Sequence, residues 1–92
     1  MSFDILIASY ERADILKKCL TSLSEQIIDE LGEIIILTQT HDSATIEIIN
    51  SFRGLLRVKL LKSSIKLRPG ASRNLLIKNS TADYLCFLDD DT

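Results

Sequence analysis

Short runs of apolar residues alternate with more polar segments along this chain of 92 residues. Consecutive apolar residues occur in Phe3–Ala8, in Glu33–Leu37 and in Tyr84–Leu88, a pattern typical of strands buried on both faces of a sheet. The segment Arg57–Leu61 alternates between apolar and basic residues, which indicates a less buried strand. The sequence therefore predicts four strands.

The segments between these strands carry apolar residues at the spacing of one helix face. The first predicted helix begins at Ala13, and an apolar patch at Gln26–Leu31 indicates its end and a loop closed by Gly32. The second helix follows a polar loop in which Asp42 or Ser43 is suited to cap it, because both side chains carry an oxygen that accepts from backbone N–H groups.

The third helix is expected to open at Pro69, whose fixed φ suits a first helical turn. We expect it to turn Ala71, Leu75 and Leu76 toward the core. The element order is thus β-α-β-α-β-α-β. This order predicts a single domain of the α/β class, a Rossmann-like doubly wound parallel sheet with right-handed crossovers.

The composition is that of a soluble globular protein, with 46% hydrophobic and 26% charged residues. A net charge of -2 offers no basic face, so nucleic acid is not an expected partner. No run reaches the roughly 18 apolar residues of a membrane span, and Met1–Asp4 lacks the basic start of a signal peptide. Cys19 and Cys86 lack metal-ligand spacing and are expected to be buried, reduced thiols. We therefore expect a cytoplasmic protein.

Three adjacent carboxylates, Asp89, Asp90 and Asp91, follow directly after the last predicted strand. Ligands of open α/β sheets bind at the carboxyl ends of the strands. Carboxylates this close repel one another unless a cation lies among them, and oxygen ligands suit Mg²⁺ or Mn²⁺. A solvated acidic tail is the alternative, but the position directly after a buried strand favours a site.

Other polar residues of the predicted loops have two interpretations each. Tyr10, in the polar break Ser9–Arg12, can stack on a nucleotide base or cap the core of the first strand. Arg73, in the helix that opens at Pro69, can pair with a diphosphate or lie on a solvated helix surface. His41 has no Ser or Cys partner at triad-like positions and is expected to be a polar loop residue. No Gly-rich phosphate loop follows any strand, which argues against a dehydrogenase or an ordinary ATPase.

Three segments resemble motifs of the inverting family 2 glycosyltransferases of the A-type fold. Asp4–Arg12 is similar to that family's first strand with Pro-Thr-Tyr-Asn-Arg, and Pro69–Asn74 is similar to its Gly-x-x-x-Ala-Arg-Asn segment. Phe87–Asp91 resembles its Phe-Leu-Asp-x-Asp. The resemblance covers essentially all 92 residues. It implies the N-terminal, nucleotide-sugar-binding half of such an enzyme, a truncated nucleotide-diphospho-sugar transferase fold.

The resemblance implies a nucleotide-diphospho-sugar donor as the ligand. Tyr10 and the backbone around Ser9 would hold the base, while Asp89 and Asp90 would contact the ribose and the nucleotide. Asp91, together with Asp89, would bind the Mg²⁺ or Mn²⁺ that bridges the diphosphate and acts as a Lewis acid for the leaving group. The residues implied to contact the nucleotide are Ser9, Tyr10, Arg12, Thr38, Arg73, Asp89 and Asp90.

Two departures from the family's motifs concern the first two strand ends. Where the family has Asp-Asp-Gly-Ser after the second strand, this chain has Thr38–His41, with Asp42 one or two positions later. Thr38 can still donate or accept a hydrogen bond, but the preference of a carboxylate for a uracil N–H is lost, so the base stays open. Ala8 stands where the family usually has proline.

The chain stops at the metal motif, so the resemblance implies that the acceptor half is missing. With that half goes the carboxylate base that inverting transfer needs, and no catalytic residue is expected in this fragment. We therefore predict that the 92 residues alone do not transfer sugar. The free apolar edge of the strand Tyr84–Leu88 is also predicted to pair with a second copy, giving a homodimer or a swapped assembly.

Two other functions suit an α/β fold with an acidic cluster. A non-catalytic, Mg²⁺-binding regulatory module of the receiver type needs a phosphorylatable Asp after its third strand, where this chain has Lys62–Ser64. A nucleotidyltransferase-like domain would carry a Gly-rich, Arg-Lys signature after its first strand, where this chain has Ala8–Tyr10. Both alternatives fit these residues less well than a glycosyltransferase does.

Overall fold

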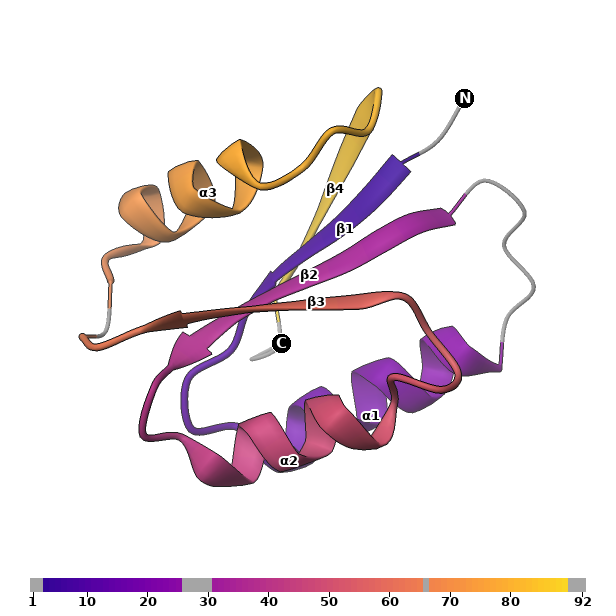
Figure 1. The fold of residues 1–92 in the computed structure, drawn as a ribbon, viewed down its shortest axis with the longest axis vertical. Helices are drawn as coiled ribbons and strands as arrows, with labels where there is room; N and C mark the ends of the chain where they lie inside the picture. Colours follow the sequence, from indigo (N-terminus) through magenta and orange to yellow (C-terminus); the bar gives the residue numbers. More distant parts are fainter. Residues whose placement is uncertain (1–2, 26–30, 66, 90–92) are drawn as a thin grey trace.

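Strands and helices alternate along the chain in the order that the sequence predicts. The computed structural model describes residues 3–25, 31–65 and 67–89 (Figure 1). The elements are β1 (Phe3–Ala8), α1 (Ala13–Ser24), β2 (Leu31–Gln39), α2 (Ser43–Ser51), β3 (Val58–Ser63), α3 (Pro69–Lys78) and β4 (Tyr84–Asp89). All four strands run parallel in one sheet, in the order β3-β2-β1-β4. The predicted α/β class is confirmed.

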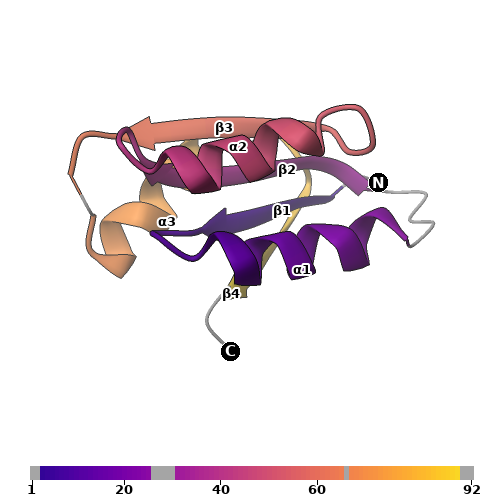
Figure 2. The same ribbon diagram turned by 90° about the horizontal axis from the view of Figure 1, so that it is seen from below.

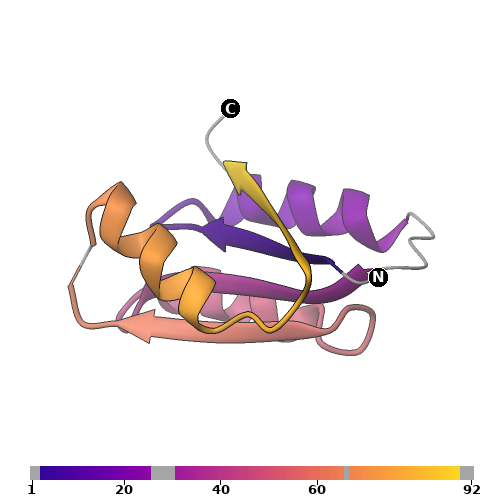
Figure 3. The same cartoon turned by 90° about the horizontal axis from the view of Figure 1, so that it is seen from above.

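Helices cover both faces of the sheet. Figure 2 shows α1 and α2 side by side on one face, and Figure 3 shows α3 on the opposite face. Successive side chains of a strand point to opposite faces. Ile5 and Ile7 of β1 therefore pack with α1 and α2, whereas Leu6 between them packs with Leu76 of α3. This two-sided burial explains why Ile5–Ile7 of β1 form an unbroken apolar run.

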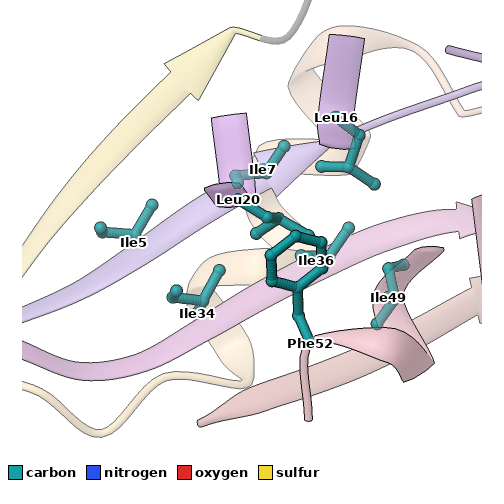
Figure 4. Packing of buried hydrophobic residues seen from close by; sticks show 8 residues of the cluster. All are labelled: Ile5, Ile7, Leu16, Leu20, Ile34, Ile36, Ile49 and Phe52. Carbon is teal, nitrogen blue, oxygen red and sulfur yellow. The ribbon is translucent and has the colours of Figure 1, made fainter. Parts of the chain in front are cut away.

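The larger core lies between the sheet and the pair α1 and α2 (Figure 4). Burying one aliphatic side chain of this kind contributes roughly 1.5–3 kcal/mol, so this cluster provides much of the stability of the fold. Its buried members are Ile5, Ile7, Leu16, Leu20, Ile34, Ile36, Ile49 and Phe52. A smaller cluster fixes α3 on the other face and consists of Leu6, Ile35, Leu37 and Leu76.

β2 begins at Leu31, so Gly32 lies inside the strand. The prediction that Gly32 closes a loop is therefore wrong. The remainder of that expected loop, residues 26–30, lies outside the described residues. The register of β1 against β2 shifts between Phe3 and Ile5, where β2 contains one residue more than β1. Such an extra residue leaves a backbone group without its partner in the ladder, and another group must satisfy it.

The buried carboxylate of Asp4 occupies the space beside this irregularity. Its Oδ1 accepts a hydrogen bond from the backbone N–H of Glu33 at 2.8 Å, and its Oδ2 accepts one from the hydroxyl of Ser80. A Cβ atom on Gly32 would collide with Oδ1 of Asp4. The glycine is therefore required by a carboxylate on the neighbouring strand rather than by a turn.

The expectation that β4 is buried on both faces is wrong. Tyr84 is 58% exposed and Phe87 is 37% exposed, because β1 is the strand's one neighbour in the sheet of the described residues. Cys86 of the same strand is exposed as well, and Cys19 is half-buried, so the expected burial of both thiols is also wrong. An apolar run thus predicted the strand correctly but not its surroundings.

The third helix opens at Pro69 as predicted, but a different residue faces inward. Ser72 and Leu76 are its buried residues, whereas Ala71 is exposed. Within the described ranges, no helix combines the length and the apolar character needed to cross a membrane.

Candidate functional site

The carboxyl ends of the strands meet at one edge of the sheet. The register places Ala8 at the end of β1 opposite Leu37 of β2 on one side and Asp89 of β4 on the other. The connections that follow β1 and β2, residues 9–12 and 40–42, therefore leave the sheet next to each other (Figure 1). This edge is where ligands bind in sheets of this type.

The segment after β1 is tied to α3 by Tyr10. The phenolic hydroxyl of Tyr10 lies 3.0 Å from Oγ of Ser72, and the half-buried ring packs with the cluster under α3. This contact supports the interpretation of Tyr10 as a cap on the core. Ser9, just before it, is fully buried and donates its backbone N–H to the carbonyl of Leu37 at 2.9 Å. Its hydroxyl has no hydrogen-bond partner among the described residues.

Glu11 has the left-handed backbone conformation, with φ of 55°. This conformation is unfavourable for a residue with a Cβ atom, and such residues cluster at functional sites. The side chain of Glu11 lies 3.8 Å from Nε2 of His41, but both side chains are well exposed and the pair contributes little. Arg12 is exposed and stands at the N-cap of α1 without a side-chain capping bond.

Asp42 joins the segment after β1 to the segment after β2. Its carboxylate is buried, with 6% of the residue exposed. Oδ2 accepts hydrogen bonds from the backbone N–H of Glu11 at 2.7 Å and from the hydroxyl of Thr38 at 3.0 Å. Oδ1 accepts one from the backbone N–H of Thr45 at 3.3 Å, so the predicted cap of α2 is confirmed.

These hydrogen bonds decide the ionisation of Asp42. Burial by itself raises its pKa, but the hydrogen bonds from Thr45, from the backbone of Glu11 and from Thr38 outweigh burial, and the pKa lies below its ordinary value. The carboxylate is therefore ionised at neutral pH. Thr38 is fully buried and directs its hydroxyl at Asp42, so a ligand does not reach that hydroxyl in this conformation.

Arg73 projects from α3 over β4. Its guanidinium carbon lies 5.0 Å from the centre of the Phe87 ring, a cation–π contact worth roughly 0.5–1 kcal/mol at an exposed site. Phe87 lies two positions before Asp89 on β4, so this contact places Arg73 near the carboxyl end of that strand. The N–H groups of the guanidinium lie in its plane and can donate hydrogen bonds to an anion at this edge.

The acidic run begins where β4 ends. Asp89 is the last residue of β4, but Asp90 and Asp91 lie outside the described residues. Within the described part of the chain, no group of three or more His, Cys, Asp or Glu residues is arranged to hold a metal ion. The Mg²⁺ or Mn²⁺ site thus stays a prediction, supported by the oxygen-rich chemistry of the run.

Two contacts of this edge were not predicted from the sequence. Ser72 was missed because its neighbour Ala71 was expected to face the core, although Ser72 stands four residues before the buried Leu76, the spacing of one helix face. The bond from Glu11 to Asp42 was missed because it joins two loops 31 residues apart and depends on the backbone conformation of Glu11.

The model of the Glycosyl transferase family 2 matches residues 4–92. The chain belongs to this family. A glycosyltransferase of amylovoran biosynthesis, AmsB of Erwinia amylovora, is 32% identical over 93 residues, which is 99% of this chain and 31% of that protein. A poly(ribitol-phosphate) beta-glucosyltransferase of Bacillus spizizenii is 30% identical over 94 residues, covering 99% of this chain and 15% of that protein.

The fold is also that of solved family structures. The crystal structure of Staphylococcus aureus TarS 1-349 in complex with UDP-GlcNAc superimposes with a TM-score of 0.88 at 23% identity. The match covers 99% of this chain and 27% of that one. The chain thus spans about a third of the length of these relatives, or less. The resemblance identified from the motifs is confirmed, the family indicates transferase activity, and the receiver and nucleotidyltransferase alternatives fall away.

Proposed function

We propose that these 92 residues are the part of a glycosyltransferase that binds a nucleotide-diphospho-sugar donor. The observation that carries the proposal is the family match, which runs from β1 through the acidic run after β4. The segments that resemble family motifs lie at, or lead into, the edge of the sheet where ligands of α/β proteins bind. TarS, which has the same fold, was crystallised with UDP-GlcNAc and with UDP, and this favours a uridine donor.

The base would lie against the segment after β1. Tyr10 offers a ring that its hydrogen bond to Ser72 holds in place, and Ser9 and Arg12 flank it. The hydroxyls of Ser9 and Thr38 are buried, so the backbone of this segment and the ring supply the contacts in place of those hydroxyls. We therefore revise the role of Thr38 from a base contact to a support of Asp42.

The diphosphate would lie near the end of β4. Asp91 with Asp89 would hold a divalent cation, Asp90 would contact the ribose, and Arg73 would face the phosphates. The cation supplies charge neutralisation for the departing nucleoside diphosphate. Carboxylate oxygens are the ligands that Mg²⁺ and Mn²⁺ prefer, so the residues at this position fit such an ion.

Two further proposals concern the behaviour of the isolated chain. Because it covers 31% of the amylovoran enzyme, we propose that it binds the donor without transferring the sugar. Turnover of a UDP-sugar with a broad set of acceptors would contradict this.

We also propose a cytoplasmic location, since Cys19 and Cys86 are not joined in a disulfide.

The exposed edge strand carries the proposal of a homodimer. Tyr84, Leu85 and Phe87 leave apolar surface on β4, and β4 has hydrogen-bonded neighbours on one side in the described sheet. An edge of this kind pairs readily with a second copy. Light scattering across micromolar concentrations should give a dimer mass, and a monomer mass throughout would refute the pairing.

Titration calorimetry with UDP and then GDP, each with and without Mn²⁺, tests the donor site. We expect binding that requires the metal and is lost in Asp91→Ala. Asp83→Ala is the matched control, because Asp83 is exposed and lies before β4, at the opposite edge of the sheet. Equal loss in both variants, or binding that Asp91→Ala does not weaken, would contradict the assignment of the metal site.

A further inference from the structure

The left-handed conformation of Glu11 needs a partner to hold it. A residue with a Cβ atom leaves this region of φ unless a contact compensates for the unfavourable backbone. The contact here is the 2.7 Å hydrogen bond from the N–H of Glu11 to Oδ2 of Asp42. Glu11 lies in the middle of the segment after β1, next to Tyr10, so this bond sets the path of the segment.

The two oxygens of Asp42 have different tasks. Oδ1 accepts from the backbone of Thr45 and caps α2, a role that concerns the helix alone. Oδ2 accepts from Glu11 and from Thr38 and joins the two loops. Because the carboxylate is buried, water competes little for these bonds. A substitution can therefore remove the hydrogen bond to Glu11 and keep the cap of α2.

We propose that Asp42 is a positioning residue of the nucleotide site, which fixes the base-binding segment by holding Glu11 in the left-handed conformation. The proposal rests on the donor site described above. Asp42 acts through the loop and does not touch the base. Asp42 thereby contributes to nucleotide affinity without touching the nucleotide. It lies after Thr38–His41, the segment that stands where the family has Asp-Asp-Gly-Ser.

The second anchor of the segment supports this role. Tyr10 is bonded to Ser72 of α3 on one side, and Glu11 is bonded to Asp42 at the start of α2 on the other. The segment is thus attached to elements on both faces of the sheet. A loop fixed at two points is organised before the ligand arrives, and less conformational freedom is lost on binding.

The test uses Asp42→Ser, because serine caps a helix about as well as aspartate but is too short to serve both Thr45 and Glu11. We expect the Kd for UDP with Mn²⁺ to rise about tenfold, as it does when a loop is in its binding conformation about a tenth of the time. Adding Glu11→Asn should restore most of the affinity, since asparagine tolerates the left-handed conformation unaided. Ser43→Ala, at an exposed neighbouring position, should bind as the unaltered chain does.

Thermal unfolding of the same variants separates positioning from capping. If Asp42 only caps α2, affinity will follow stability and Glu11→Asn will restore neither, which overturns the proposal. Unchanged affinity in Asp42→Ser overturns it as well. An unaltered chain that does not bind UDP refutes the donor site itself and removes this proposal with it, whereas binding that Asp42→Ser weakens and that Glu11→Asn restores supports both.

Discussion

Replacing Gly32 by alanine should destabilise the fold strongly, although glycine to alanine is often neutral in a strand. The new Cβ would overlap Oδ1 of Asp4 and would lie 3.1 Å from the carbonyl oxygen of Phe3. The carboxylate is buried and bonded to Glu33 and Ser80, so it does not move aside without losing these bonds. The backbone oxygen belongs to the paired strand and is held by the sheet.

The size of the effect follows from the bonds that would be lost. A hydrogen bond to a charged group contributes roughly 1.5–3 kcal/mol, so displacing the carboxylate of Asp4 loses about 3 kcal/mol or more. The smaller entropy of the unfolded alanine chain returns about 0.4–1 kcal/mol. We therefore expect a net loss of about 2 kcal/mol or more, a large part of the roughly 5–14 kcal/mol typical of a domain of this size.

Urea denaturation followed by circular dichroism measures this loss as a lower midpoint with an unchanged slope. Gly70→Ala is the matched control. Nothing lies within 4 Å of a Cβ atom at Gly70, and the residue is in the first turn of α3, so this variant should be neutral or slightly more stable. Asp4→Ala removes the carboxylate that the new Cβ would meet and so provides a second check. In that background, Gly32→Ala should cause little further loss of stability. Gly32→Ala as stable as Gly70→Ala would refute the reasoning.

Two further predictions concern the polar contacts at the other end of the sheet. Because the folded pKa of Asp42 lies below its ordinary value of 3.8, its charge stabilises the fold above that pH, and the contribution disappears as the pH falls through the folded pKa. The unaltered chain should therefore melt at a higher temperature than Asp42→Asn at pH 6, and this difference in melting temperature should be smaller at pH 3. The same difference at both pH values would contradict this. Tyr10→Phe and Ser72→Ala should each cost about 1 kcal/mol, and the double variant little more, since each single variant already removes the hydrogen bond between the two residues. Additive losses in urea denaturation would show that the two residues act separately.

The order of elements was predictable because it depends on local patterns. Each apolar run is long enough for one strand, and the helix stripes between them recur at helical spacing. Asp42 or Ser43 was predicted as a cap from residue type and place before a helix, and the structure has Asp42 in this role. These signals lie within a few residues of the structure that they specify.

The remaining features depend on contacts between distant segments. Gly32 resembles a loop residue in sequence, and the carboxylate of Asp4, 28 positions away, explains why this position of a strand carries glycine. Ser72 faces inward because its hydroxyl meets Tyr10, 62 residues earlier. The burial of β4 depends on what lies beyond it in the sheet, so an apolar run alone does not specify its exposure. A single sequence contains no direct signal for such pairs.

The polar groups of β1 are divided between its two ends. Asp4 stabilises the start of the strand, and the segment that would bind the nucleotide begins at Ser9. Asp4 and Ser9 are five positions apart in extended backbone, a distance of about 16 Å, which is farther than the range over which substitutions usually influence one another. Changes in the loops at the carboxyl edge that spare the hydrogen-bonded residues Tyr10 and Asp42 can therefore alter the proposed nucleotide preference without disturbing the contacts of Asp4. An engineer seeking a new donor preference has the same freedom, provided that the contacts of Asp4 with Glu33 and Ser80 are left intact.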